Sequence, residues 1–118
     1  MYKSEAHTHE LYTTAKGCAW QCDLTDRIYI NFKGNVLAFK IQDFLTFRRK
    51  VQSIDIHEMI FNLSDDYDFE IIESPQNQLS LKLNLCDVIQ FRELLDGTRF
   101  AIELYSMLHE VLGDFEIA

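Results

Sequence analysis

The sequence predicts an α+β domain, with an antiparallel sheet made of an N-terminal meander and a C-terminal hairpin and covered by amphipathic helices. Three observations support this. Apolar and polar residues alternate between residues 18 and 40, as in strands with one buried face. They alternate again between residues 79 and 85. Elsewhere the apolar residues recur every three or four positions, which is typical of a helix. At 118 residues, we expect one domain over 1–118.

The meander is predicted to contain three consecutive strands. In the first, Cys18, Trp20 and Cys22 share one parity, and we expect them to point inward beneath the helices. The turn before the second strand is expected at Thr25-Asp26. Gly34-Asn35 predicts a two-residue hairpin turn before the third strand, because both residue types tolerate positive φ.

The ends of the meander are also assigned. Residues 11–15 are expected to add an edge strand, and residues 1–10 to form a loose N-terminal segment. After the meander, Phe44, Phe47, Val51 and Ile54 recur at helical spacing, which predicts a helix from about Gln42. Residues 55–63 fit either a short helix or a strand, and residues 64–68 form a polar loop.

The C-terminal part is predicted to hold the hairpin and a long helix. Residues 69–74 pair with the leucine-rich strand through a turn at Pro75-Gln76-Asn77. The remaining chain has a wide apolar stripe over 86–112, and Gly97 is expected to break or kink this helix. The members of the stripe are Val88, Phe91, Leu94, Leu95, Ala101, Ile102, Leu104, Tyr105, Leu108, Val111 and Leu112.

Charge argues against several classes of partner. The net charge is −8, which opposes binding to nucleic acid or to an anionic membrane. The charge is uneven, with eight basic and five acidic side chains in residues 1–54 but three basic and fourteen acidic ones in residues 55–118. The single basic cluster, Arg48 to Lys50, is too small for a nucleic-acid interface.

Cellular location is predicted from signals that the sequence lacks. The N-terminal residues contain no apolar signal region, and no window reaches eighteen consecutive apolar residues. The three cysteines form no framework of paired spacings. We therefore expect a cytoplasmic protein of bacterial type with reduced thiols.

Four residues of zinc-ligand type, His7, His9, Cys18 and Cys22, fall within sixteen positions. In a strand, the two cysteines would stand about 13 Å apart. Two thiolates on one zinc ion are only about 4 Å apart. The two histidines are the better chelating pair, at about 6.6 Å on one strand face. We expect no bound metal and no cofactor, and keep these four residues as the candidate ligands.

Other motifs are incomplete. His57-Glu58 begins like a zinc-protease helix, but Phe61 occupies the position of the second histidine. The acidic residues between Asp65 and Glu70 lack the glycine and the distal glutamate of a calcium loop. Cys86 is expected at the start of the last helix, where the helix dipole could lower its pKa, but we expect it to face the core.

Residues 17–22, residues 28–37 and the helix with Phe44 and Phe47 resemble a family of short uncharacterised bacterial proteins. In that family a glycine-led strand ending in cysteine precedes an Ile-x-Leu-x-Phe-Gly-Asn hairpin and a phenylalanine-spaced helix. The likeness covers about residues 9–54. A Cys-x-x-Cys pair of the family corresponds here to Cys22 and Thr25, and Lys33 is an extra residue before Gly34. The resemblance implies the fold and no activity.

No catalytic constellation is found in the sequence, so we lean toward a protein that is not an enzyme. Nine Phe, five Tyr and one Trp, with the wide apolar stripe, exceed what one small helix face usually hides. We expect an interaction module that binds a second copy of itself or another protein. The alternative is a small-molecule or metal-binding protein that uses His7, His9, Cys22 or His57.

Overall fold

The computed structural model describes residues 8–61 and 69–116, with side chains as far as Met107, and confirms the α+β class. The first sheet has four antiparallel strands in the order β1-β2-β3-β4. Their bounds are β1 Thr8–Thr13, β2 Gly17–Cys22, β3 Arg27–Phe32 and β4 Asn35–Phe39. The expected edge strand is therefore β1, and Thr8 to Glu10, placed by the sequence in a loose segment, belong to it.

Three helices and a second sheet complete the chain. The elements are α1 Ile41–Gln52, α2 Ile56–Phe61, β5 Glu70–Ser74, the short 3-10 helix η3 Pro75–Asn77, β6 Leu79–Leu83 and α3 Leu85–Glu116. The hairpin β5–β6 forms a two-stranded sheet of its own. The segment left open at 55–63 contains the short helix α2, while the loop expected at 64–68 lies outside the described residues.

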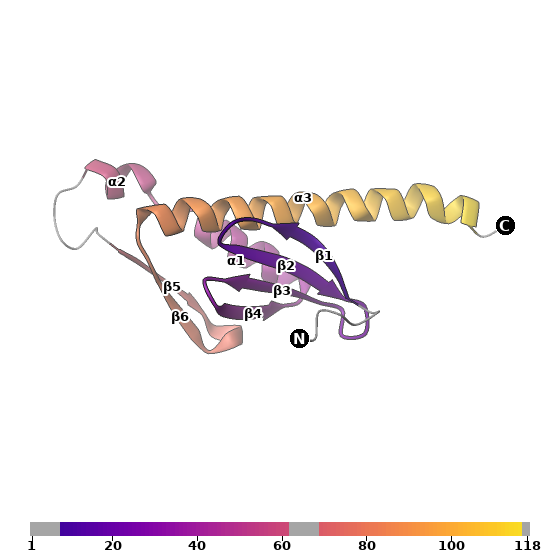
Figure 1. Ribbon diagram of the computed structural model, residues 1–118, viewed down its shortest axis with the longest axis horizontal. Helices are drawn as coiled ribbons and strands as arrows, with labels where there is room; N and C mark the ends of the chain where they lie inside the picture. The colour runs from indigo at the N-terminus through magenta and orange to yellow at the C-terminus, as the bar shows by residue number, and fades with distance from the viewer. Residues whose placement is uncertain (1–7, 62–68, 117–118) are drawn as a thin grey trace.

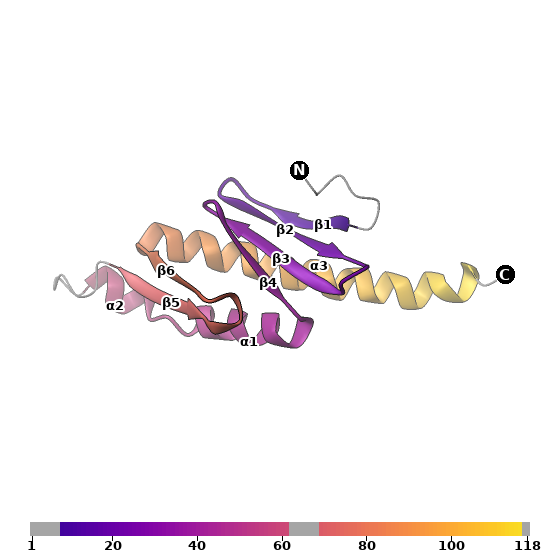
Figure 2. The same cartoon turned by 90° about the horizontal axis from the view of Figure 1, so that it is seen from below.

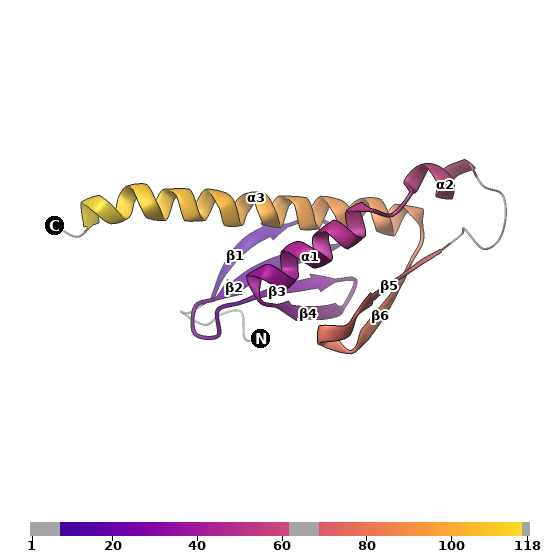
Figure 3. The ribbon, with the colours of Figure 1, turned by 180° about the vertical axis from the view of Figure 1, so that it is seen from behind.

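One face of the four-stranded sheet carries the core. The long helix α3 packs over β1 and β2, and α1 packs over β3 and β4 and against α3 (Figures 1 and 3). Phe32 of β3 stacks on Phe91 of α3 with ring centroids 4.5 Å apart, and Phe39 stacks on Phe47 of α1 at 4.9 Å. Phe44, Phe47 and Val51 of the predicted apolar stripe are buried on α1, and Ile54 is also buried but lies beyond the end of this helix at Gln52.

The hairpin between β3 and β4 turns one residue earlier than predicted. Phe32 pairs with Asn35, so the two turn residues are Lys33 and Gly34, with φ of 52° and 85°. The prediction of a Gly34-Asn35 turn is wrong because Lys33 takes the left-handed position and Asn35 begins β4. This φ pattern is that of the two-residue hairpin turns that fit the twist of the strands.

The prediction that Cys18, Trp20 and Cys22 point beneath the helices is also wrong. In the register of β2 and β3, Ala19 pairs with Ile30 of the core, so Trp20, which pairs with Tyr29, lies on the opposite face of the sheet. Its ring stacks on Tyr29 at 5.5 Å, and both cysteines are half-buried. The core face of β2 carries the small residues instead, because α3 approaches it closely.

The break expected at Gly97 is absent, since α3 is a continuous helix through this position. The reason is the contact made by Tyr12 of β1. A Cβ atom on Gly97 would lie 2.3 Å from the Tyr12 ring, so the missing side chain gives this ring room against α3. Glycine in a helix costs about 1 kcal/mol relative to alanine, and the packing around Gly97 offsets this cost.

Candidate functional site

The helix α3 has two apolar sides. On the first side Phe91, Leu95 and Thr98 are fully buried in the core of the domain. On the second side Phe100, Leu104 and Met107 are 65%, 43% and 60% exposed; we call these three residues the outer stripe. At 3.6 residues per turn, the outer stripe occupies a sector of about 60° on the side opposite the core.

The outer stripe lies where α3 leaves the rest of the domain. The C-terminal half of the helix extends past the sheet, as Figures 1 and 2 show from two directions. Near this point the ring of Tyr105 stacks on His9 of β1 at 4.8 Å, and His9 Nδ1 lies 3.9 Å from Asp23. Tyr105 is on the side of β1, so the outer stripe faces away from the domain.

Leu104 belongs to the apolar stripe predicted from the sequence, but Phe100 and Met107 were not predicted. The wider predicted stripe combines residues from both sides of the helix. The available signal was the spacing of four and then three residues, which places apolar side chains along one seam of a helix. Further toward the start of α3, the same side of the helix carries the exposed residues Cys86, Ile89 and Glu93.

The start of α3 is held by an ion pair that the sequence analysis also missed. Lys33 Nζ donates to both carboxylate oxygens of Asp87 at 2.9 and 3.0 Å, which joins the β3–β4 turn to the helix. Asp87 accepts from the backbone N–H of Asn84, and Asn84 Oδ1 accepts from the N–H of Asp87. This reciprocal pair is a capping box, and the spacing Asn-x-x-Asp was its signal.

The Asp87 side chain is nearly buried, and its negative charge is stabilised by hydrogen bonds from neighbouring groups. Burial raises the pKa of this carboxyl, but the hydrogen bonds from Lys33 and from the Asn84 backbone outweigh it, with the positive charge of Lys33 adding to them. The pKa of Asp87 is therefore lowered from its ordinary value, and this carboxylate stays ionised at neutral pH.

The candidate metal ligands do not converge. His9 lies on the core face of the four-stranded sheet, whereas Cys18 and Cys22 lie on the opposite face. His57 is on α2, which lies beside the start of α3 (Figure 1). His9 instead stacks on Tyr105, which is twenty positions after the start of α3, a rise of about 30 Å along the helix. His7 lies outside the described residues. Within 8–61 and 69–107 no three His, Cys, Asp or Glu side chains are grouped closely enough to hold a metal ion.

The other sequence motifs also have local roles. The His57 ring contacts Phe61, the residue that replaces the second histidine of the zinc-protease motif, with centroids 4.5 Å apart. Cys86 is exposed in the first turn of α3, so the expectation that it faces the core is wrong. In the basic cluster, Arg48 pairs with Asp96 at 2.9 Å, and Lys50 Nζ donates to the Glu73 carbonyl at 2.6 Å.

Cys22 has a distinctive environment at the end of β2. A hydrogen bond from the Thr25 hydroxyl is the largest influence on its thiol, and together with the backbone of Thr25 it lowers the pKa of Cys22 from the ordinary value. Partial burial opposes this shift.

We expect Cys22 to react with iodoacetamide at a lower pH than an ordinary thiol, because the thiolate is the reactive form. Replacing Thr25 with valine removes the hydroxyl and should move the midpoint of the alkylation rate to higher pH. Mass spectrometry of the peptide that contains Cys22 measures this rate, in a variant with Cys18→Ser and Cys86→Ser. An unchanged midpoint in Thr25→Val would contradict the role of this hydrogen bond.

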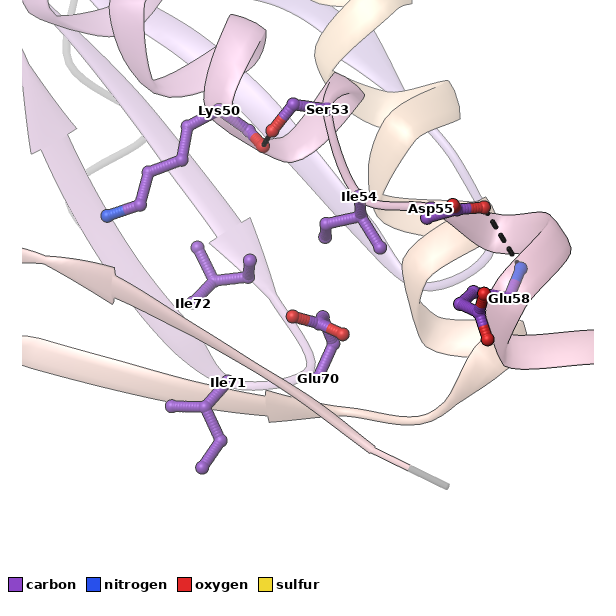
Figure 4. A pocket seen from close by; sticks show the side chains of 8 residues that line it. All are labelled: Lys50, Ser53, Ile54, Asp55, Glu58, Glu70, Ile71 and Ile72. Carbon is purple, nitrogen blue, oxygen red and sulfur yellow. Dashed lines mark hydrogen bonds between the residues drawn. The ribbon is translucent and has the colours of Figure 1, made fainter. Parts of the chain in front are cut away.

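A hollow of about 350 Å³ lies between the end of α1, α2 and β5. Lys50 stands at one end of it and Asp55 and Glu58 at the other (Figure 4). Two of these polar groups already form hydrogen bonds within the domain: Lys50 Nζ donates to the Glu73 carbonyl, and Asp55 Oδ1 accepts from the Glu58 backbone N–H at 2.9 Å. The hollow therefore has fewer polar groups available to bind a ligand than the number of its charged side chains indicates.

In the part of the chain that the structure describes, no helix combines the length and the apolar character needed to cross a membrane. Comparisons with protein-family models, curated proteins and solved structures found no match to this chain. The outer stripe of α3 is therefore the feature from which a function is inferred.

Proposed function

We propose that this protein is a non-enzymatic interaction module that self-associates through the outer stripe of α3. The observation that carries the proposal is the second apolar side of this helix. A helix that only covers its own sheet needs a single apolar side, but Phe100, Leu104 and Met107 are exposed on the side away from the core.

The spacing of the outer stripe supports a helix as its partner. Residues four and then three positions apart form a continuous seam, which a second helix with the same seam can fill by knobs-into-holes packing. A second copy of the chain supplies this seam, and in the sequence the spacing continues to Val111. Burial of large apolar side chains is the main favourable contribution to such an association.

Light scattering after size exclusion tests the proposal. We expect the chain to elute with twice its mass of 13.9 kDa and to dissociate on dilution. Leu104→Glu should raise the dissociation constant at least about tenfold, because a carboxylate would be buried in the seam.

The matched control is Leu24→Glu, which makes the same change at a leucine that is 72% exposed in the turn after β2. This variant should dimerise like the natural chain. A monomer at every concentration up to roughly 1 mM would overturn the proposal. Equal weakening by both substitutions would also contradict it, because the effect would not depend on the outer stripe.

A further inference from the structure

We infer that two copies of the chain pair through their outer stripes as parallel, in-register helices. This inference rests on the proposed function and adds the orientation of the pair. In such a pair each apolar residue meets its own copy, so Phe100, Leu104 and Met107 form three successive apolar layers about a two-fold axis along the helices.

The position of Glu103 favours the parallel orientation. This residue flanks the outer stripe on one edge, is exposed, and forms an ion pair with Arg99 at 3.0 Å on its own helix. In a parallel pair the two copies of a flanking residue lie on opposite edges of the interface. An antiparallel pair centred on Leu104 brings the two Glu103 carboxylates to the same edge, where like charges oppose association.

The residues before Phe100 set where the parallel pairing begins. One heptad before Phe100 the same seam position is occupied by Glu93, which is exposed. Gly97 between them contacts the Tyr12 ring of its own chain and has no side chain to offer a partner helix. Two Glu93 carboxylates facing each other repel. The paired segment therefore starts at Phe100, and the two helices diverge toward the start of α3.

The shape of the domain permits this arrangement. The four-stranded sheet and α1 lie on one side of α3 (Figures 1 and 3), and the outer stripe is on the opposite side of the helix. Two copies placed back to back along α3 keep their sheets on the outside of the pair. Diverging helices upstream of Phe100 leave further space between the two domains.

Cys86 is a native probe of the orientation, since it is exposed on the same side of α3 as the outer stripe. It precedes Leu104 by eighteen residues, so an antiparallel pair centred on Leu104 would separate the two Cys86 residues by about 54 Å. In a parallel pair the two Cys86 residues lie at the same height along the helices. Because the helix axes are about 10 Å apart at the seam, we expect the distance between the two Cys86 residues to stay below roughly 30 Å.

The experiment attaches a nitroxide label to Cys86 in the Cys18→Ser, Cys22→Ser variant and measures the distance between labels by pulsed electron paramagnetic resonance. We expect a dimer with a label distance below about 30 Å. A dimer with a distance above about 50 Å overturns the parallel orientation but leaves the proposed self-association intact. If the labelled chain and the unlabelled natural chain are both monomeric, the parallel orientation and the proposed self-association are both overturned.

A substitution provides a second measurement. Glu93→Leu should lower the dissociation constant at least about threefold in a parallel pair, because it replaces a repulsive layer with an apolar one. In an antiparallel pair centred on Leu104 this residue lies level with position 115 of the partner and not with its own copy. No repulsion between two Glu93 carboxylates is then relieved, and the constant should fall less than threefold. Asp43→Leu, an acidic-to-leucine change on α1, is the matched control and should leave the constant unchanged in both cases.

Discussion

Replacing Gly17 with alanine should lower the free energy of unfolding by about 2–3 kcal/mol, because the new methyl group has no space. A Cβ atom on Gly17 would lie 2.1 Å from the backbone oxygen of Asn31, on the neighbouring strand β3. It would also lie 3.2 Å from Leu94 Cδ2 of α3. Because backbone lies on one side of Gly17 and a core side chain on the other, β2 cannot shift to make room for the methyl group without disturbing β3 or α3. Urea denaturation followed by circular dichroism measures the loss.

The matched control is a substitution at Gly34, where no heavy atom lies within 4 Å of an added Cβ. The φ of 85° at this position suits asparagine better than other side chains, so Gly34→Asn should cost much less than Gly17→Ala. Comparable losses at the two glycines would show that backbone conformation, rather than the contact with β3, determines the effect at Gly17.

Replacing Lys33 with methionine should lower the free energy of unfolding by about 2 kcal/mol at pH 7. The substitution keeps the length of the side chain but leaves the nearly buried Asp87 carboxylate without its cation. The loss should stay below the roughly 3–5 kcal/mol of a fully buried pair, because Lys33 is 42% exposed and water screens its charge.

The effect of Lys33→Met should depend on pH. The pKa of Asp87 is lowered in the folded state, so its ionisation stabilises the fold above the unfolded-state pKa of about 3.9. This contribution is lost as the pH falls through the lower folded-state pKa. The difference between the two proteins should therefore be full at pH 7 and shrink below about pH 4. Lys40→Met, at an exposed lysine before α1, is the control, and a difference independent of pH would contradict this account.

The elements that bury one clear side were predictable from the sequence. Phe44, Phe47 and Val51 mark the core side of α1 because polar residues occupy most of its other positions. The leucines of β6 mark its buried face in the same way, although the strand ends at Leu83 and Leu85 already belongs to α3. Periodicity determines an element when the two sides differ in polarity.

The face of β2 was not predictable because both of its faces carry apolar residues. Trp20 and the two cysteines form the more apolar side, yet Gly17 and Ala19 face the core, where α3 leaves space only for small side chains. Size, rather than hydrophobicity, decided the orientation of this strand. That requirement comes from a helix almost eighty residues further along the chain, which no local pattern contains.

The candidate site was predictable only in part for a related reason. The wide apolar stripe of the last helix was recognised, but a sequence does not show which part of a stripe the rest of the chain covers. Phe100 and Met107 are apolar like Leu94 and Leu95, and the folded structure shows that the first two are exposed and the last two are buried. The role of Lys33 was hidden in the same way, since its partner Asp87 is fifty-four positions away in the chain.

The continuity of α3 through Gly97 has a thermodynamic consequence. The same rigid helix supplies Phe91 and Leu95 to the interior and carries the exposed side chains of the outer stripe beyond Thr98. Whatever binds those exposed side chains recognises only the folded chain, and so draws the folding equilibrium toward it by mass action. Binding at the exposed part of α3 and folding of the domain are thereby coupled. The melting temperature therefore rises with the concentration of the binding partner.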